Sequence, residues 1–491
     1  MRVTATLLSF TCALMCANTA SAQARRFPKM DRGLESLAVA GSKSHTSTVI
    51  VTLADGTDLP ADLQKYSRFG RLNALGAHVL DIPDNQLPNV SNLTQTVHMH
   101  SDAVVRGLDF RTDVTSGSFF VNHTVGLTGA GVTVAVLDSG IAKGQGDFSG
   151  TKVRLFKDFV NNKTQQYDDY GHGTHVAGIL AGNGLDTNGK EMGVAPGAQL
   201  VVLKVLDSQG NGTVANVIAA LDWLAVYGPT HNVRVANLSF GSEPCDQPDQ
   251  DPLALATKAL VNRGIIVVAA AGNDGTSNGK KVWGGIPSPA DAPWVLTVGA
   301  SSSMGTLSRK DDQVASFSSR GPAVGRYAKP DVVASGVGIV APVPKGGSLV
   351  LANPNLLVTL QCLTLGCSNQ DLFMSLSGTS MAAPVVSGTV ALMLQANPNL
   401  TPNLVKAIIQ YTAEEHSGYS PLEEGAGFLN TLGAVRLAKF FASGLPGSQA
   451  PFSPAWSRQI FWGNYRLTGG IIQPNASAWR TDVVWGQRTR S

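Results

Sequence analysis

Between residues 131 and 300, the apolar residues alternate between two patterns, one typical of buried strands and one typical of helices. Continuous apolar runs, typical of fully buried strands, occur at 131–138, 198–206, 233–240, 265–271 and 294–300. Between these runs, apolar residues recur at helical spacing after residue 171 and at 214–226 and 252–264. Strands that alternate with helices predict a parallel sheet covered by helices on both faces. Ligands of such sheets bind beyond the carboxyl ends of the strands, so residues that directly follow a strand are the candidates for chemistry.

A smaller pattern precedes this region. Residues 47–53 and 74–82 read as strands, 84–93 as a short helix or turn, and 94–100 as a last strand. The segment contains no obvious chemistry. The fold class we predict is therefore α/β, a parallel sheet flanked by helices, preceded by a small α+β unit.

The first residues have the features of a secretory signal peptide. Arg2 precedes a short apolar run, and Ala20 and Ala22 place small residues at −3 and −1 of a cleavage site near Ala22 or Ala24. A membrane anchor is the alternative, but the run is short and interrupted by polar residues. No later segment is long enough to span a bilayer. We expect residues 1–22 to be the signal and the protein to be secreted.

Composition narrows the choice of partners. The chain has 491 residues, of which 43% are hydrophobic and 14% charged, with a formal net charge of +3. A chain of this length can bury a full hydrophobic core. Its near-neutral charge gives no reason to expect nucleic acid or acidic membranes as partners. In an oxidising compartment Cys362 and Cys367 can form a small-loop disulfide, which leaves Cys245 unassigned.

The last fifty residues contain a short internal repeat. Residues 455–464 and 478–487 both carry Ala-Trp, five further residues and Trp-Gly. Two copies are too few for a solenoid, and the stretch 443–454 before them reads as a linker. We treat 441–491 as a tail whose role is open. It can be a second propeptide, a surface-binding module or strands packed on the preceding domain.

Three residues in unusual contexts carry candidate chemistry. Asp138 ends a strand, His172 lies in "GHGTHVAG", and Ser380 lies in "GTSMAAP" at the start of a buried helix. A serine hydroxyl becomes a nucleophile when a base takes its proton and a carboxylate orients that base. Each residue also has a structural alternative: Asp138 as a turn former, Ser380 as a helix cap, and His172 with His175 as metal ligands.

The segments "VAVLDSGI", "GHGTHVAGI" and "GTSMAAP" resemble the three active-site signatures of the subtilisin-like serine proteases, in that family's chain order. The resemblance covers roughly residues 120–440, within a catalytic domain that we place at 113–440. It implies Asp138 as the orienting acid, His172 as the general base and Ser380 as the nucleophile. His175 corresponds to a structural position. The chemistry of the family requires no cofactor.

The resemblance also implies an oxyanion site and a substrate cleft. The Asn273 side-chain amide would donate to the oxyanion beside the Ser380 N–H, although a turn-forming Asn is the local alternative. Substrate contacts are expected from two stretches and one pocket wall: Ser239, Phe240 and Gly241; Gly210 and Gly212; Ala270 and Gly272. The walls carry no charge, which favours apolar or neutral P1 residues. Asp168 and Asp169 either favour a basic residue nearby or belong to a solvated loop.

Two further expectations follow from the family. Asp147, nine residues after Asp138, is a candidate ligand for a structural calcium ion, and the loop 182–193 is rich in oxygen atoms. Residues 23–112 resemble the inhibitory propeptide, which would be a partner of the mature enzyme and be removed by cleavage near 100–120.

The sequence thus predicts a secreted serine endopeptidase that acts on proteins or peptides. The rivals are a non-catalytic secreted binding protein on a protease scaffold, and a metal-dependent hydrolase that uses His172 and His175.

Overall fold

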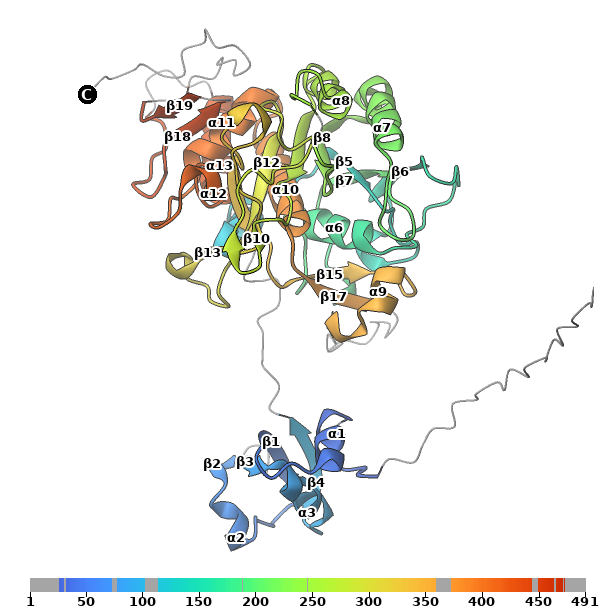
Figure 1. Cartoon of the computed structure of the whole chain (residues 1–491), viewed down its shortest axis with the longest axis vertical. Coiled ribbons are helices and arrows are strands. Elements are labelled where there is room, and N and C mark those ends of the chain that lie inside the picture. Colours follow the sequence, from blue (N-terminus) through green and yellow to red (C-terminus); the bar gives the residue numbers. More distant parts are fainter. Residues whose placement is uncertain are drawn as a thin grey trace, which may run out of the picture. The chain divides into compact units, whose positions relative to one another are not determined.

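The computed structural model describes most of the chain. The described residues are 26–30, 32–72, 77–101, 114–187, 189–244, 246–358, 372–443, 449–462, 465–470 and 472. The expected signal peptide, the Cys362–Cys367 disulfide, Cys245 and the second Trp-Gly repeat lie outside them. The chain divides into two compact units, Met1–Arg106 and Gly107–Ser491, and each is described by itself (Figure 1).

The first unit is a small α+β structure. Its antiparallel sheet has the strand order β2-β3-β1-β4. The strands are β1 (Thr46–Leu53), β2 (Ser67–Leu72), β3 (Ala77–Pro83) and β4 (Thr96–Ser101). Alternate residues of β1 are buried, and they pack in an apolar core with Leu34 of α1 and Leu87 of α3. The helices are α1 (Arg32–Ala40), α2 (Ala61–Gln64) and α3 (Leu87–Asn92). The sequence pattern missed α1 and β2.

The second unit is built on a large sheet with the order β13-β12-β9-β8-β5-β7-β6, in which β14 also pairs with β12. All pairings are parallel except that of β13 with β12. The strands are β5 (Thr133–Asp138), β6 (Val153–Asp158), β7 (Gln199–Lys204), β8 (Val233–Leu238), β9 (Ile266–Ala270), β12 (Leu296–Ser302), β13 (Gln313–Val314) and β14 (Val332–Ser335). The predicted α/β fold class is confirmed.

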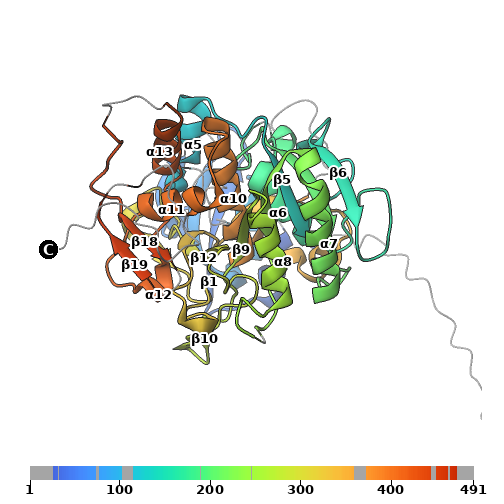
Figure 2. The ribbon, with the colours of Figure 1, turned by 90° about the horizontal axis from the view of Figure 1, so that it is seen from above.

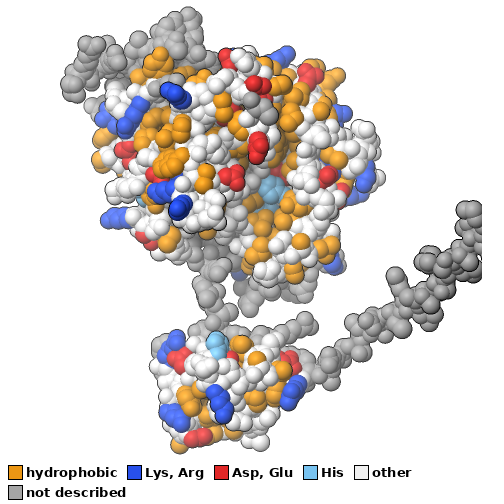
Figure 3. Space-filling model, viewed as in Figure 1, with side chains coloured by type: hydrophobic (Ala, Val, Ile, Leu, Met, Phe, Trp, Pro, Cys, Tyr) orange, Lys and Arg blue, Asp and Glu red, His pale blue; other side chains and the backbone are white. Residues whose placement is uncertain are grey.

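Helices cover both faces of this sheet. The helices α6 (His172–Ala181) and α10 (Thr379–Ala396) share one apolar core with one face, and α7 (Val214–Tyr227) and α8 (Pro252–Val261) share a second core with the other. Figure 2 shows α7 and α8 side by side. Of the described helices, α10 alone is long and apolar enough to cross a membrane, and 83% of its apolar window is buried within the protein. Charged side chains of both signs are interspersed over the face shown in Figure 3.

A smaller sheet and the C-terminal elements complete the unit. The order β15-β17-β16 joins Ile339–Val343, Leu372–Leu376 and Leu357–Val358, beside the short helix α9 (Ser348–Ala352). The elements α11 (Pro402–Thr412), α12 (Pro421–Glu424) and α13 (Thr431–Ser443) precede the hairpin β18 (Gln459–Trp462) and β19 (Tyr465–Thr468).

The first Trp-Gly repeat of the tail is buried in this unit. Trp456 and Trp462 are 6% and 7% exposed, and the Trp456 ring meets Tyr411 of α11 edge to face. Of the roles left open for the tail, the described residues adopt the one in which strands pack on the preceding domain.

Candidate active site

Asp138 and His172 form the centre of the site. Asp138 ends β5, which lies between β7 and β8 in the sheet. The next strands along the chain, β6 and β7, lie on one side of β5 and β8 lies on the other, so the strand order reverses beside Asp138. The Asp138 carboxylate is fully buried and accepts a hydrogen bond of 2.7 Å from Ser139 N. His172 Nδ1 lies 2.8 and 3.0 Å from its two oxygens. This pairing assigns the proton of a neutral ring to Nδ1 and leaves Nε2 as the base.

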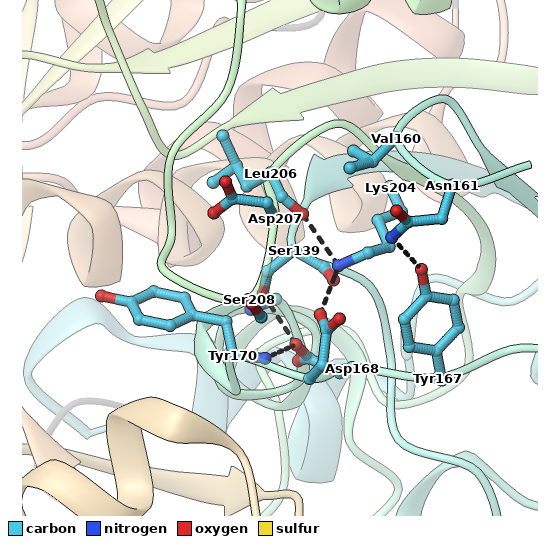
Figure 4. Close-up of polar contacts among 12 residues, drawn as sticks. Ser139, Val160, Asn161, Tyr167, Asp168, Tyr170, Lys204, Leu206, Asp207 and Ser208 are labelled. Carbon is cyan, nitrogen blue, oxygen red and sulfur yellow. Dashed lines mark hydrogen bonds and ion pairs between the residues drawn. The ribbon is translucent and has the colours of Figure 1, made fainter. Parts of the chain in front are cut away.

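Asp168 fixes the start of the helix that carries His172. Its Oδ1 accepts from Gly171 N at 2.8 Å and from Ser139 Oγ at 2.8 Å, and its Oδ2 accepts from Thr174 N at 2.9 Å. The carboxylate therefore satisfies backbone N–H groups at the N-terminus of α6, where negative charge is favourable. Figure 4 shows Asp168 between Ser139 and Tyr170.

Asp169 has a different partner. The Lys204 ammonium is fully buried and donates to Asp169 Oδ1 at 2.6 Å. It also donates to Ser139 O at 2.6 Å and to Leu206 O at 2.8 Å (Figure 4). Asp168 is buried, which contradicts the solvated-loop alternative for this residue, whereas the Asp169 side chain is 33% exposed. Both carboxylates lock the backbone around Asp138 and His172. Sequence reasoning missed their role because it depends on contacts with Ser139 and Lys204, which are distant in the chain.

The pKa values of the two histidines of α6 are shifted in opposite directions. Burial disfavours the charged form of His172, but the Asp138 charge and hydrogen bond outweigh it, so the pKa of His172 is raised above 6.5. Burial lowers the pKa of His175 to about 4, and its Nε2 contacts Met374 O at 2.9 Å. The two rings have different partners. No group of three His, Cys, Asp or Glu residues close enough to hold a metal occurs within the described ranges.

Ser380 lies in the first turn of α10, half-buried. Pro384 has no N–H, so Ser380 O has no partner four residues on, and Ser239 Oγ donates to it at 2.9 Å instead. Ser380 Oγ in turn donates to Ser239 O at 2.9 Å and not to His172. The structure thus brings Ser380 and Ser239 together, with each hydroxyl donating to the carbonyl oxygen of the other residue.

Asn273 lies just beyond β9 and is exposed. Its Oδ1 accepts from Thr379 N at 2.9 Å and from Thr379 Oγ1 at 3.1 Å. These bonds orient the amide so that Nδ2 is left as a donor beside the N-terminus of α10. Thr379 Oγ1 also accepts from Gly272 N at 3.1 Å. The role of Thr379 was missed, although its position directly before Ser380 was the available signal.

The predicted substrate segments lie around this point. Ser239, Phe240 and Gly241 follow β8, and Ser242 pairs with Ser288 as an isolated antiparallel bridge. Ala270 ends β9, and Gly272 has a positive φ of 94°.

The second substrate stretch is a tight loop. It closes where Leu206 pairs with Gly212. Gly210 has a φ of 78°, and a Cβ atom there would lie 2.5 Å from the Tyr170 ring, so this position needs glycine.

Among the described residues, Asp147 belongs to no group of three His, Cys, Asp or Glu side chains that could hold a metal ion. It is fully buried in the turn 146–148, and its Oδ1 accepts from Asp186 N at 3.1 Å while Asp186 Oδ2 accepts from Asp147 N at 2.9 Å. The two carboxylates cap each other's turns.

Comparisons with known proteins identify the family of the chain. Residues 129–434 match the model of the subtilase family. Serine protease AprX of Bacillus subtilis (strain 168) is 36% identical over 374 residues, which cover 75% of this chain and 80% of AprX. Subtilisin Savinase of Lederbergia lenta is 33% identical over 314 residues, 64% of this chain and 94% of that protein. The crystal structure of a cold-adapted subtilisin-like serine proteinase, at 29% identity, covers 62% of this chain and 90% of its own with a TM-score of 0.47.

The fold and the family match define the class of protein: a serine-type endopeptidase. The chain belongs to the subtilase family, which confirms the resemblance inferred from its three signature segments.

Proposed function

We propose that the chain is a secreted endopeptidase in which Asp138, His172 and Ser380 form the catalytic triad and Asn273 completes the oxyanion hole. The observation that carries the proposal is the hydrogen bond from His172 Nδ1 to the buried Asp138 carboxylate at 2.8 Å. A buried carboxylate on Nδ1 sets the tautomer and stabilises the imidazolium that forms when Nε2 takes a proton.

In the proposed reaction His172 Nε2 takes the proton of Ser380 Oγ as this oxygen attacks the peptide carbonyl carbon. The oxyanion that forms accepts hydrogen bonds from Ser380 N–H and Asn273 Nδ2. The C–N bond then breaks, and His172 gives its proton to the leaving amine. Water, deprotonated by His172, hydrolyses the acyl-enzyme and restores the serine.

The Ser380 hydroxyl must exchange its partner for this to happen. It donates to Ser239 O at 2.9 Å, and that bond must break before the hydroxyl donates to His172. Catalytic hydrogen bonds are often not formed before substrate binds. We propose that the bound substrate backbone takes over Ser239 O, which releases the hydroxyl.

The substrates we propose are unfolded segments of proteins or peptides. Ser239, Phe240 and Gly241 on one side and the Gly210–Gly212 loop on the other would hold the substrate backbone, and Ala270 with Gly272 would line the P1 pocket. These residues carry no charged side chain, which supports apolar or neutral P1 residues.

We further propose synthesis as a pre-proenzyme, with residues 1–22 as the signal, 23–112 as the propeptide and 113–440 as the catalytic domain. The separate apolar core of the first unit supports a propeptide that folds as a body of its own. Calcium has no part in the proposed chemistry. Asp147 remains a candidate ligand by its position alone.

The test is the intact mass of the secreted protein after reaction with a fluorophosphonate. We expect one adduct on a shortened wild-type chain and none on a full-length Ser380→Ala variant. Ser377→Ala is the matched control, because Ser377 lies three residues away, is exposed and accepts from Gly338 N. It should mature and take the label.

Each rival predicts another result. No adduct on protein already free of residues 23–112 would favour the non-catalytic binding protein. Activity that is lost with a chelator and restored by zinc, without any serine adduct, would favour the metal-dependent hydrolase.

A further inference from the structure

The loop that carries Asn273 is held from behind by residues 316–321. Ser319 N donates to Gly272 O at 2.9 Å, Asp274 N donates to Ser319 Oγ at 3.0 Å, and Gly275 N donates to Phe317 O at 2.8 Å. The backbone on both sides of Asn273 is therefore tied to one segment. A Cβ atom on Gly275 would lie 2.0 Å from Ser318 O, so the two segments are in close contact.

Arg320 extends this support to the C-terminal part of the chain. Its side chain is 4% exposed, and Nη1 donates to Gly275 O, two residues beyond Asn273. Its Nε lies 3.3 Å from Glu423 Oε1. A buried guanidinium needs its counter-ion, because an unpaired charge in the interior is strongly unfavourable. The position of Arg320 therefore depends on Glu423.

Glu423 is itself rigidly placed. It lies in the short helix α12 and is 4% exposed. Its Oε2 accepts from both Ser420 N and Ser420 Oγ at 3.0 Å, which forms a capping box at the start of the helix. The neighbouring Leu422 O accepts from Gly321 N at 2.9 Å. Side chain and backbone of α12 thus both hold the segment that contains Arg320.

The far end of the Asn273 loop has the same anchor. Gly284 N and Gly285 N donate to Arg320 O at 3.0 and 3.1 Å. Lys281, in the hairpin between these two ends, pairs with Glu423 Oε1 at 2.6 Å but is more than half exposed. Among the described residues, Thr379 alone is hydrogen-bonded to the Asn273 side chain, so the remaining precision of this side chain must come from the backbone.

We propose that Arg320 and Glu423 are positioning residues for Asn273: the buried ion pair clamps Gly275 O and thereby fixes the side-chain amide at the distance an oxyanion requires. The inference rests on the proposed role of Asn273. Preorganised donors must be held within about 0.5 Å of the productive geometry.

The test is a double-mutant cycle on kcat, with active sites counted by fluorophosphonate titration. Asn273→Ala should lower kcat by about 10²–10³-fold. Glu423→Gln should lower kcat about tenfold. This is less than the roughly 10²-fold cost expected if the Asn273 amide were misplaced by about 1 Å. The KM should stay within about twofold of the wild-type value. The double variant should be no slower than Asn273→Ala, because Glu423 acts only through that amide.

Two controls separate positioning from general loss of structure. Glu414→Gln makes the same chemical change in another partly buried ion pair, with Arg309 Nε at 3.1 Å, but it does not touch the Asn273 loop. It should reduce the melting temperature without changing kcat per active site. Lys281→Gln removes only the exposed partner of Glu423 and should change kcat by less than about twofold.

The outcomes are decisive. If the Glu423→Gln and Asn273→Ala effects multiply, the ion pair does not act through Asn273 and the proposal is overturned. If Glu423→Gln does not fold, Arg320→Lys carries the same cycle, since it keeps the charge and loses the planar fork. Failure of wild-type Ser380 to take the label would instead overturn the proposed function, which is a separate result.

Discussion

Two fully buried aspartates, at different places along the same sheet, have opposite surroundings. Asp331, in the segment before β14, accepts hydrogen bonds from Thr297 N at 2.7 Å, Lys329 Nζ at 2.8 Å and Lys406 Nζ at 2.9 Å. Asp138, at the end of β5, accepts from Ser139 N and from one imidazole. The Asp331 carboxylate faces two lysine side chains, and the Asp138 carboxylate faces one imidazole.

This difference separates a structural carboxylate from one suited to catalysis. Lys329 and Lys406 are almost fully buried, and burial lowers the pKa of Lys406 to about 7 although the Asp331 charge opposes this. No reactant can reach that cluster. The imidazole beside Asp138 is 16% exposed, so it can gain a proton from a substrate-side group and be stabilised when it does. A buried charge becomes useful for chemistry when its partner is titratable and accessible.

The largest expected effect is that of Asp138→Asn. The amide removes the charge that stabilises the imidazolium and favours the wrong ring tautomer, so kcat should fall by about 10⁴-fold. Steady-state kinetics on a peptide p-nitroanilide would measure it, with Ser380→Ala as the baseline. A loss below about tenfold would show that Asp138 does not differ from Asp331 in the way proposed.

Asp331→Asn should produce the complementary result. It removes the anion that Lys329 and Lys406 face in the interior, which we expect to cost about 3–5 kcal/mol of unfolding free energy. Denaturant unfolding in a Ser380→Ala background, which prevents self-digestion, would measure this loss. In the active background, kcat per titrated site should stay near the wild-type value. A large fall in kcat per site with unchanged stability would contradict the comparison.

The pH dependence tests the Asp138–His172 pair more finely. The pKa of His172 is raised above 6.5, and only the neutral ring can accept the serine proton. The value of kcat/KM should therefore rise with pH through a midpoint above 6.5. Removing the Asp138 charge leaves burial opposed mainly by the weaker effect of the Asp168 charge, so the residual activity of Asp138→Asn should have a lower midpoint. An unchanged midpoint in that variant would mean that Asp138 does not set the pKa of His172.

Much of this arrangement was predictable from the sequence. The strand runs placed Asp138 at a carboxyl end, and the segments around His172 and Ser380 marked them as a set. The contacts of Asp168 with Ser139, of Thr379 with Asn273 and of Arg320 with Gly275 were not predictable, because they join residues tens of positions apart in the chain. The same reason hid the direction of the Ser380 hydroxyl, which depends on the carbonyl of Ser239.

A third buried carboxylate, Asp291, has no cation within hydrogen-bonding distance and sharpens the comparison. Neither of its oxygens has a hydrogen-bond partner among the described residues, and burial together with the Asp251 charge raises its pKa to about 7. A raised pKa means that the folded state holds the proton more tightly, so stability is full below pH 4 for this group and declines until the pH passes about 7.

Asp291→Asn removes that titration. We expect the wild type to lose about 1–3 kcal/mol more than the variant between pH 5 and pH 8. Melting temperatures at both values, in the Ser380→Ala background, would measure the difference. Parallel changes in the two proteins would show that Asp291 keeps an ordinary pKa, as a carboxylate does when it has found a partner. Asp291 would then belong with Asp331, and burial without a cation would no longer separate the three aspartates.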